Sequence, residues 1–192
     1  PQKVVYAFDS PYHKNLTRIS DPLGTLYELE YDKITKTLTK ITDRWGDWVK
    51  FTYNAISKVN QLEDSAGRKV TYKYSRLKGL LASVVDVLGD ETVNEYDSRN
   101  NLSEKRYSDG VKVLTQFDDK RRAVAQGNHR DKRMYRFVYD DRKSKVTCYE
   151  KNRRVLTAYY NSMHKIVKSV DAAGNVETNT FDKAGHATKK KG

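Results

Sequence analysis

Residues 53–74 read YNAISKVNQLEDSAGRKVTYKY, and the pattern of this stretch returns along the whole chain. It begins and ends with tyrosines that are 21 residues apart, and it contains Asp64-Ser65-Ala66-Gly67 near its middle. Val70, Tyr72 and Tyr74 alternate with other residues, which is the period-two pattern of a strand with one apolar face. A unit of this length therefore predicts two short strands and two turns.

The first element of the repeat is an aromatic anchor followed by Asp, Asn or Ser. Successive anchors are separated by 21 to 23 residues, and this regularity indicates a tandem array. The anchors are Phe8, Tyr31, Tyr53, Tyr74, Tyr96, Phe117, Tyr139, Tyr160 and Phe181. We predict that residues 1–192 form a single array of about eight units, in which residues 186–192 are a basic tail that frays.

The second element, Asp-x-x-Gly, lies near the middle of most intervals. Its glycine supplies the positive φ of a turn, and its aspartate can accept backbone N–H hydrogen bonds there. We expect the same of the polar residue after each anchor, such as Asp32 and Asp97. The complete copies pair Asp21 with Gly24, Asp43 with Gly46, Asp64 with Gly67, Asp86 with Gly89 and Asp171 with Gly174. Repetition at fixed spacing is typical of scaffold positions rather than catalytic ones.

The array as a whole predicts an all-β fold. Its 21- and 22-residue units are expected to form tandem β-hairpins in one continuous, twisted antiparallel sheet, which is open or curled. Each anchor ring is expected at a strand end, where it packs on the equivalent ring one repeat away. The apolar face of such a sheet needs cover, which tight curling, packing of one half on the other, or self-association would provide.

Composition narrows the classes of function. The 192 residues include 37 Lys and Arg against 25 Asp and Glu, a net charge of +12. The apolar runs are too short to span a bilayer, and we predict no transmembrane segment and no targeting signal in the chain. A single cysteine, Cys148, excludes an intrachain disulfide framework. The histidine spacing does not fit a metal site, and the sequence lacks phosphate-loop and nucleophile motifs. We therefore predict no catalytic residues, no metal and no cofactor.

Basic residues concentrate in the last two-fifths of the chain. If the repeats stack in register, those in the turns are expected to form a basic rim along one edge of the sheet. The candidates are Arg122, Arg130, Arg133, Arg142, Lys145, Arg153 and Arg154. Such a rim suits an anionic polysaccharide, an envelope phosphate or an acidic protein, with nucleic acid disfavoured. The alternative is a solvated surface whose lysines discourage edge pairing.

Three stretches resemble the YD-repeat or RHS (rearrangement hotspot) family: Phe181-Asp182-Lys183-Ala184-Gly185-His186-Ala187, Tyr96-Asp97-Ser98-Arg99-Asn100-Asn101-Leu102, and Asp64-Ser65-Ala66-Gly67-Arg68. In that family consecutive hairpins form one long sheet that spirals into a hollow shell. Its members include bacterial contact-dependent toxins, insecticidal toxin complexes and large animal cell-surface proteins. The resemblance covers essentially the whole chain, although most first turns lack the family glycine.

The resemblance implies a non-catalytic scaffold or shell segment, secreted or at the bacterial cell surface and associated with a toxin. Its partner would be the remainder of a larger shell or a self-association partner. About sixteen strands, at about 4.8 Å each, form a sheet too narrow to enclose a domain of about 100 residues. The alternative is a stand-alone module that binds through the basic rim. A third hypothesis is self-cleavage, because Asp21-Pro22-Leu23-Gly24-Thr25 resembles the start of the family's cleavage junction, with Thr25 in place of Leu.

Overall fold

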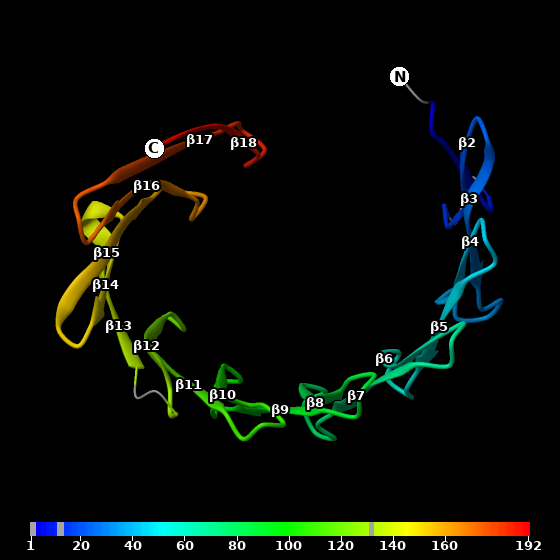
Figure 1. The fold of residues 1–192 in the computed structure, drawn as a ribbon, viewed down its shortest axis with the longest axis horizontal. Helices are drawn as coiled ribbons and strands as arrows, with labels where there is room; N and C mark the ends of the chain where they lie inside the picture. Colours follow the sequence, from blue (N-terminus) through cyan, green and yellow to red (C-terminus); the bar gives the residue numbers. More distant parts are fainter. Residues whose placement is uncertain (1–2, 11–13, 131–132) are drawn as a thin grey trace. The chain divides into compact units, whose positions relative to one another are not determined.

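The computed structural model describes residues 3–10, 14–130 and 133–192, and almost all of its regular structure is β-strand (Figure 1). Each strand pairs antiparallel with the next strand in sequence, which makes the sheet a meander of successive hairpins. The predicted all-β fold, with tandem hairpins in one open antiparallel sheet, is confirmed. Two compact units share the sheet, Pro1–Val93 and Asn94–Gly192, and the division falls within one strand.

The strands of the first unit follow the predicted repeat. They are β1 (Val5–Phe8), β2 (Leu16–Asp21), β3 (Gly24–Tyr31), β4 (Leu38–Asp43), β5 (Trp48–Tyr53), β6 (Val59–Asp64), β7 (Lys69–Tyr74) and β8 (Leu81–Val85). The next strand, β9 (Glu91–Tyr96), contains the division between the units.

The second unit continues the same pattern. Its strands are β10 (Leu102–Arg106), β11 (Lys112–Phe117), β12 (Ala123–Asn128), β13 (Arg133–Asp140), β14 (Lys145–Glu150), β15 (Arg153–Tyr160), β16 (Ile166–Asp171), β17 (Val176–Phe181) and β18 (Ala187–Lys191), with a 3-10 turn, η1 (Asp141–Lys143), between β13 and β14. Residues 186–192 were expected to fray, and here the structure differs. Strand β18 pairs with β17, and the Thr188 hydroxyl lies 2.9 Å from that of Thr180.

Most anchors end a strand, and a β-bulge accompanies them. Glu30 pairs with Lys40 and Tyr31 pairs with Leu38, so Thr39 has no partner of its own. The same shift in register occurs at Phe8, Tyr53, Tyr74, Phe117, Tyr160 and Phe181. A bulge adds one residue to one strand and increases the local twist, so the bulges place extra twist beside the turns that follow the anchors.

The register of the first unit separates an apolar face from a charged face. Phe51 pairs with Leu62, which pairs with Val70, and these side chains share a face because paired residues point the same way. On the opposite face, ion pairs join neighbouring strands, as between Lys40 and Glu30 at 3.2 Å and between Lys69 and Glu63 at 3.7 Å. Lys73 of β7 reaches across β8 to Glu91 of β9 at 2.9 Å. This is the pattern of an antiparallel sheet with one face toward water.

The described residues of each unit form no closed hydrophobic core. Among the described residues, Ala158 is the only buried hydrophobic one, with 2% of its surface exposed. Ser83, Asn101 and Thr147 are the buried polar residues of the same set. Most apolar side chains on the sheet are half-buried, because they pack against neighbours on the sheet face and have no second layer above them within their unit.

Candidate functional site

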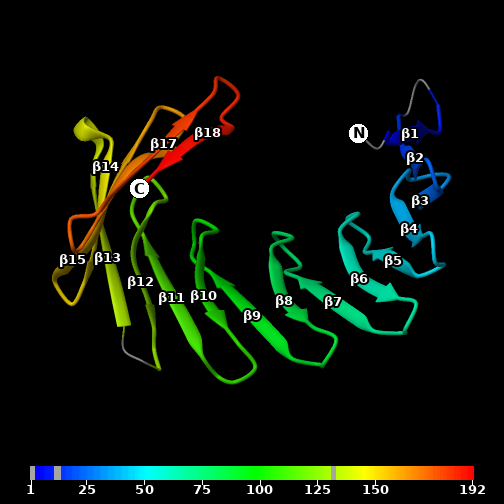
Figure 2. The ribbon, with the colours of Figure 1, turned by 45° about the horizontal axis from the view of Figure 1, so that its top comes forward.

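The polar chemistry that the sequence repeats lies in the turns, at the two ends of the strands. Turns alternate between these ends, as expected of a meander (Figure 2). We call the end formed by turns that follow an anchor the anchor edge; in the first unit, the turns of this edge that are described in full are residues 32–37, 54–58 and 75–80. We call the other end the glycine edge; in the first unit its turns are residues 21–24, 43–47, 64–68 and 86–90.

Turns of the glycine edge are organised by their aspartate. Asp64 Oδ1 accepts hydrogen bonds from the backbone N–H of Ala66 at 3.1 Å and of Arg68 at 2.9 Å, while Gly67 adopts a φ of +79°. The Arg68 side chain donates to the same carboxylate and, as the main cause, lowers the pKa of Asp64. The carboxylate is therefore an ionised structural acceptor of its own turn.

Turns of the anchor edge have the same design. Asp97 Oδ1 accepts the N–H of Arg99 and of Asn101, each at 2.9 Å, and Asp97 Oδ2 accepts the Asn101 side-chain amide at 2.8 Å. The Asn101 amide, followed by its backbone N–H, lowers the pKa of Asp97. In two other repeats Asn54 and Asn161 perform this role with a neutral oxygen, which accepts two N–H bonds at 3.0 Å in each turn. The turn thus requires an acceptor and not a charge.

The tyrosine anchors make a contact that the sequence did not predict. Tyr53 donates its hydroxyl to the carbonyl of Leu38, which is the first strand residue after the preceding turn of the anchor edge. The equivalent pairs are Tyr31 with Leu16, Tyr74 with Val59 and Tyr139 with Ala123, over sequence separations of 15 or 16 residues. The expected ring-on-ring ladder is not what links these four anchors to the neighbouring repeat. The recurring link is this hydroxyl–carbonyl bond.

The predicted basic rim is divided between both edges of the second unit. Arg122, Arg142 and Lys145 lie in or beside turns of the anchor edge, whereas Arg130, Arg153 and Arg154 lie at the glycine edge. Arg133 begins β13 at the glycine edge, and its side chain is outside the described part of the structure. The physical reason is the meander itself, because consecutive turns point to opposite ends of the strands. The predicted residues therefore do not gather along one edge.

Several of these basic side chains are occupied by contacts within the sheet. Arg122 forms ion pairs with Asp118 at 2.8 Å and Asp141 at 2.6 Å, and it lies over the Tyr139 ring with 4.1 Å to the centroid. Arg130 pairs with Asp109 at 3.1 Å. Lys145 lies 3.9 Å from Asp140, and Arg154 donates to the carbonyl of Val170 at 3.2 Å.

Some of these contacts brace one turn against the next turn of the same edge. Arg130 and Asp109 form such a brace in the second unit, and Arg44 pairs with Asp21 at 2.8 Å in the first. The members are 20 to 23 residues apart in sequence, as are Lys120 with Asp141 and Arg99 with Asp119. Oppositely charged residues at this separation could have predicted these ion pairs from the sequence. A separation of one repeat places the two residues in adjacent turns of the same edge.

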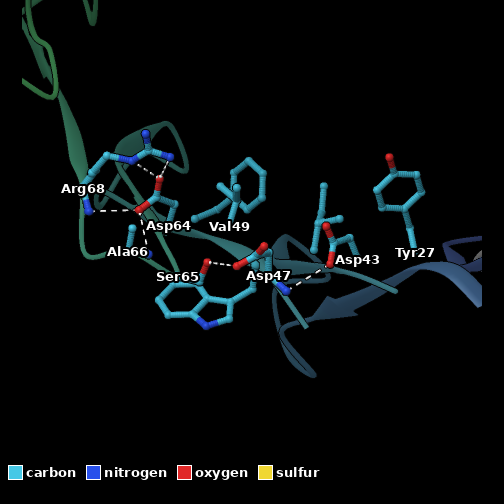
Figure 3. Close-up of a pocket in the computed structure, with 11 residues that line it drawn as sticks. Tyr27, Asp43, Asp47, Val49, Asp64, Ser65, Ala66 and Arg68 are labelled. Atoms are coloured by element: carbon cyan, nitrogen blue, oxygen red, sulfur yellow. Dashed lines mark hydrogen bonds and ion pairs between the residues drawn. The ribbon is translucent and has the colours of Figure 1, made fainter. Parts of the chain in front are cut away.

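A hollow of about 590 Å³ lies on the apolar face of the first unit (Figure 3). Val49 and Phe51 contribute apolar lining, and three carboxylates border the hollow. Each carboxylate has a partner: Asp43 accepts two backbone N–H bonds, Asp47 accepts the Ser65 hydroxyl at 2.6 Å, and Asp64 holds its turn with Arg68. Carboxylates engaged in this way hold turns in shape and leave no paired acid and base facing the hollow.

The described residues contain no cluster of three or more His, Cys, Asp or Glu side chains placed to hold a metal ion. Within the same part of the chain, no helix has the length and apolar character needed to cross a bilayer. Cys148 is half-buried in β14, and burial, followed by the charge of Glu150, raises the pKa of its thiol.

Comparison with known proteins gives similarity at the level of structure. No protein-family model and no curated protein matches the sequence. Among solved structures, the Photorhabdus luminescens Tc holotoxin pore superposes with a TM-score of 0.56 over 97% of this chain, at 12% identity. The TcdB2–TccC3–Cdc42 structure gives a TM-score of 0.61 over 98% of this chain, at 13% identity. The chain spans 14% and 13% of the length of those two chains, and at this identity the likeness shows the fold alone.

Proposed function

We propose that the chain is a segment of an RHS/YD-repeat shell, a non-catalytic scaffold of a secreted or cell-surface bacterial toxin. One observation carries the proposal: an uninterrupted meander of hairpins superposes over nearly its whole length on a small fraction of Tc toxin chains. The single layer supports it, because each unit has an apolar face with no second layer of its own. The rest of a larger shell would continue the sheet and cover that face.

The turn chemistry supports a scaffold over an enzyme. Carboxylates such as Asp64 and Asp97 accept two or more hydrogen bonds within their own turns, and these bonds lower their pKa values. A general acid at neutral pH would need a raised pKa. Binding through a single basic rim lacks comparable support, because the rim residues lie at two edges and several have acidic partners.

The size and location of the native protein test the shell proposal. An antibody raised against the 192 residues would be used to blot culture medium and cell fractions of the source organism, with antibody preabsorbed on the recombinant chain as the control. We expect a species far larger than the 22.2 kDa of this chain, in the medium or at the cell surface. A 22.2 kDa species confined to the cell interior would contradict the proposal.

Intact mass tests the non-catalytic part separately. The recombinant chain is incubated for days at neutral pH beside an Asp21→Ala variant. This variant lacks the aspartate of the segment that resembles a cleavage junction. We expect the mass of both proteins to stay at that of the full chain. Fragments that end near Gly24 in the wild type, and that are absent from the variant, would show self-cleavage.

A further inference from the structure

The described turns of the anchor edge in the first unit expose a row of large aliphatic side chains. Ile34, Ile56 and Leu77 each stand two positions after the polar residue that follows an anchor, and they are 58% to 98% exposed. Successive turns of one edge are two strands apart, about 9.6 Å. The basic residues Lys33, Lys36, Lys58, Arg76 and Lys78 accompany this row against one acidic residue, Asp32, so the three turns carry a net charge of +4.

The glycine edge of the same unit has the opposite charge and a similar row. Leu23, Trp45 and Leu88 occupy one position of the Asp-x-x-Gly turn and are 80% to 84% exposed. The acidic residues of these turns are Asp21, Asp43, Asp47, Asp64, Asp86 and Asp90, and the basic ones are Arg44 and Arg68, so the four turns carry a net charge of −4. Large apolar side chains this exposed are typical of contact surfaces when they form a row.

The turns hold both rows in fixed positions. The backbone N–H of Ile34 donates to Asp32, and the N–H of Trp45 donates to Asp43, each at 2.9 Å. The N–H of Leu88 likewise donates to Asp86 at 2.8 Å. Each apolar tip therefore extends from a hydrogen-bonded turn, and its presentation costs little conformational entropy on binding.

The rows are a property of the first unit rather than of the repeat. In the second unit, the positions equivalent to Ile34 hold Arg99, Lys120, Arg142, Met163 and Ala184. The turn geometry is kept there while the apolar tips are mostly lost. The repeat therefore does not require these tips for its own folding.

We propose that the anchor edge of the first unit docks onto the glycine edge of the first unit in a second copy of this chain. The charges of +4 and −4 are complementary, so lysines and arginines face aspartates. Both rows lie on turns with the same two-strand spacing, and Ala66 interrupts the glycine-edge row in its third turn, so two adjacent tips of the anchor edge meet Leu23 and Trp45 in register. The contact is head to tail, and a pair of copies keeps one free edge of each kind. Association is therefore open-ended and not limited to a dimer.

Charge complementarity favours a second copy over an anionic membrane as the partner. Aliphatic tips among lysines would also suit an anionic lipid surface. A membrane would use the anchor edge alone, and it would leave Leu23, Trp45 and Leu88 exposed on an acidic edge that anionic lipid repels. Docking between copies uses both rows. This inference does not depend on the shell proposal, because it concerns the edges of the sheet and not its faces.

The first test measures self-association of the full chain by sedimentation velocity over a range of concentrations. We expect the weight-average sedimentation coefficient to rise continuously with concentration and to rise less in 1 M salt, where the Debye length is about 3 Å. Ile34→Ser with Leu77→Ser should weaken association at least about tenfold, because the tips lose their apolar contact. Met163→Ser, at the equivalent turn position of the second unit, is the matched control and should leave association unchanged.

The second test exchanges the charges of the edges. Lys33→Glu, Lys36→Glu and Arg76→Glu together give the anchor edge a net charge of −2, and Asp47→Lys, Ala66→Lys and Asp90→Lys together give the glycine edge a net charge of +1. Each triple variant then has two edges of like sign and should remain monomeric. An equimolar mixture of the two variants should associate again, because each kind of edge finds an opposite charge on the other chain.

Three results would overturn the proposal. The wild-type chain could stay monomeric at every concentration. The triple variants could associate on their own as well as the wild type does, which would place the contact on a sheet face or an edge strand. Flotation of the wild type with phosphatidylserine vesicles, lost in the anchor-edge triple variant and without association in solution, would assign the row to a membrane instead. Circular dichroism of every variant checks that the fold is retained.

Discussion

The hydroxyl of Tyr53 donates a hydrogen bond to the carbonyl oxygen of Leu38, 2.7 Å away, and so joins the end of one strand to the first residue after the preceding turn of the anchor edge. Equivalent bonds at Tyr31, Tyr74 and Tyr139 make this a repeated link between turns. Burial raises the pKa of Tyr139 and, together with the charge of Asp9, that of Tyr31, so these hydroxyls remain protonated donors at neutral pH.

Removal of one such hydroxyl should destabilise the array measurably. Tyr53→Phe keeps the ring and leaves the Leu38 carbonyl without this donor, so we expect a loss of about 0.5–1.5 kcal/mol in the free energy of unfolding. Urea denaturation followed by circular dichroism measures the loss. Tyr27→Phe is the matched control, because the Tyr27 side chain is exposed to solvent. Equal stability of the two variants would show that the Tyr53 bond contributes nothing.

Positive φ angles in the turns predict that loss of glycine from one turn destabilises the chain and that introduction of glycine into another turn stabilises it. Gly67 has a φ of +79° with no atom within 4 Å of an added Cβ, so Gly67→Ala should cost about 1–2 kcal/mol through backbone strain alone. Lys36 has a φ of +60° and is exposed, and Lys36→Gly should stabilise the chain by relieving the same strain. Lys33→Gly, in the same turn but without a positive φ, should not stabilise it. Thermal unfolding of the three variants and of the wild type measures these changes in stability.

Acid should unfold the array through its turn aspartates. Hydrogen bonds from the turn lower the pKa values of Asp32, Asp97 and Asp182 in the folded chain. A group whose pKa is lowered by folding contributes stability above its unfolded value, about 3.9, and this stability is lost as the pH falls through the folded value. We therefore expect the chain to be stable at pH 5–7 and to unfold steeply below about pH 4, as followed by circular dichroism.

An Asp→Asn substitution in the acid-unfolding experiment keeps the hydrogen-bond acceptor of the turn and removes its charge. Asp97→Asn keeps an oxygen in the place where Asn54 and Asn161 already serve, so the turn should form while this site stops titrating. The acid transition should then become shallower. Asp97→Ala removes the acceptor and should lower stability at every pH. A transition of unchanged steepness in Asp97→Asn would show that this carboxylate does not drive acid unfolding.

The thiol of Cys148 should react slowly. Its half-buried position, and then the nearby charge of Glu150, raise its pKa, so a smaller fraction is thiolate at pH 8. We expect a several-fold lower rate with Ellman's reagent in the folded chain than in urea. Glu150→Gln removes the negative charge and should increase the folded-state rate. A folded rate equal to that in urea would mean that the cysteine is fully accessible.

Most of the fold can be predicted from short-range patterns in the sequence. Alternation in Val70, Tyr72 and Tyr74 indicates a strand, and the spacing from Asp64 to Gly67 indicates the turn, because both follow from the stereochemistry of a few adjacent residues. The antiparallel meander follows from short connections. The turn between β14 and β15 lacks the glycine motif but is still a tight two-residue turn, because Lys151 and Asn152 both adopt positive φ, at 45° and 65°.

Contacts between repeats were harder to predict. The Tyr53 bond to Leu38 depends on the bulge that shifts the register at Tyr53, and alternation alone does not reveal a bulge. The location of the basic residues was not predictable from charge clusters alone, because clusters along the chain do not show at which end of the strands each turn lies. Arg122 and Arg130 are eight residues apart in sequence, and the intervening strand β12 carries them to opposite edges.

The braces between adjacent turns have a consequence for how such a chain changes over generations. Arg44 reaches Asp21 and Arg130 reaches Asp109, and each of these contacts joins neighbouring repeats. A duplication or loss of one whole 21- or 22-residue unit would give the repeats on either side a new neighbour of the same kind, so little of the remaining structure would have to adapt. Recombination in register would therefore alter the length of this protein more readily than its local structure, whereas an insertion of one residue within a strand would turn the apolar side chains in the rest of that strand to the wrong face.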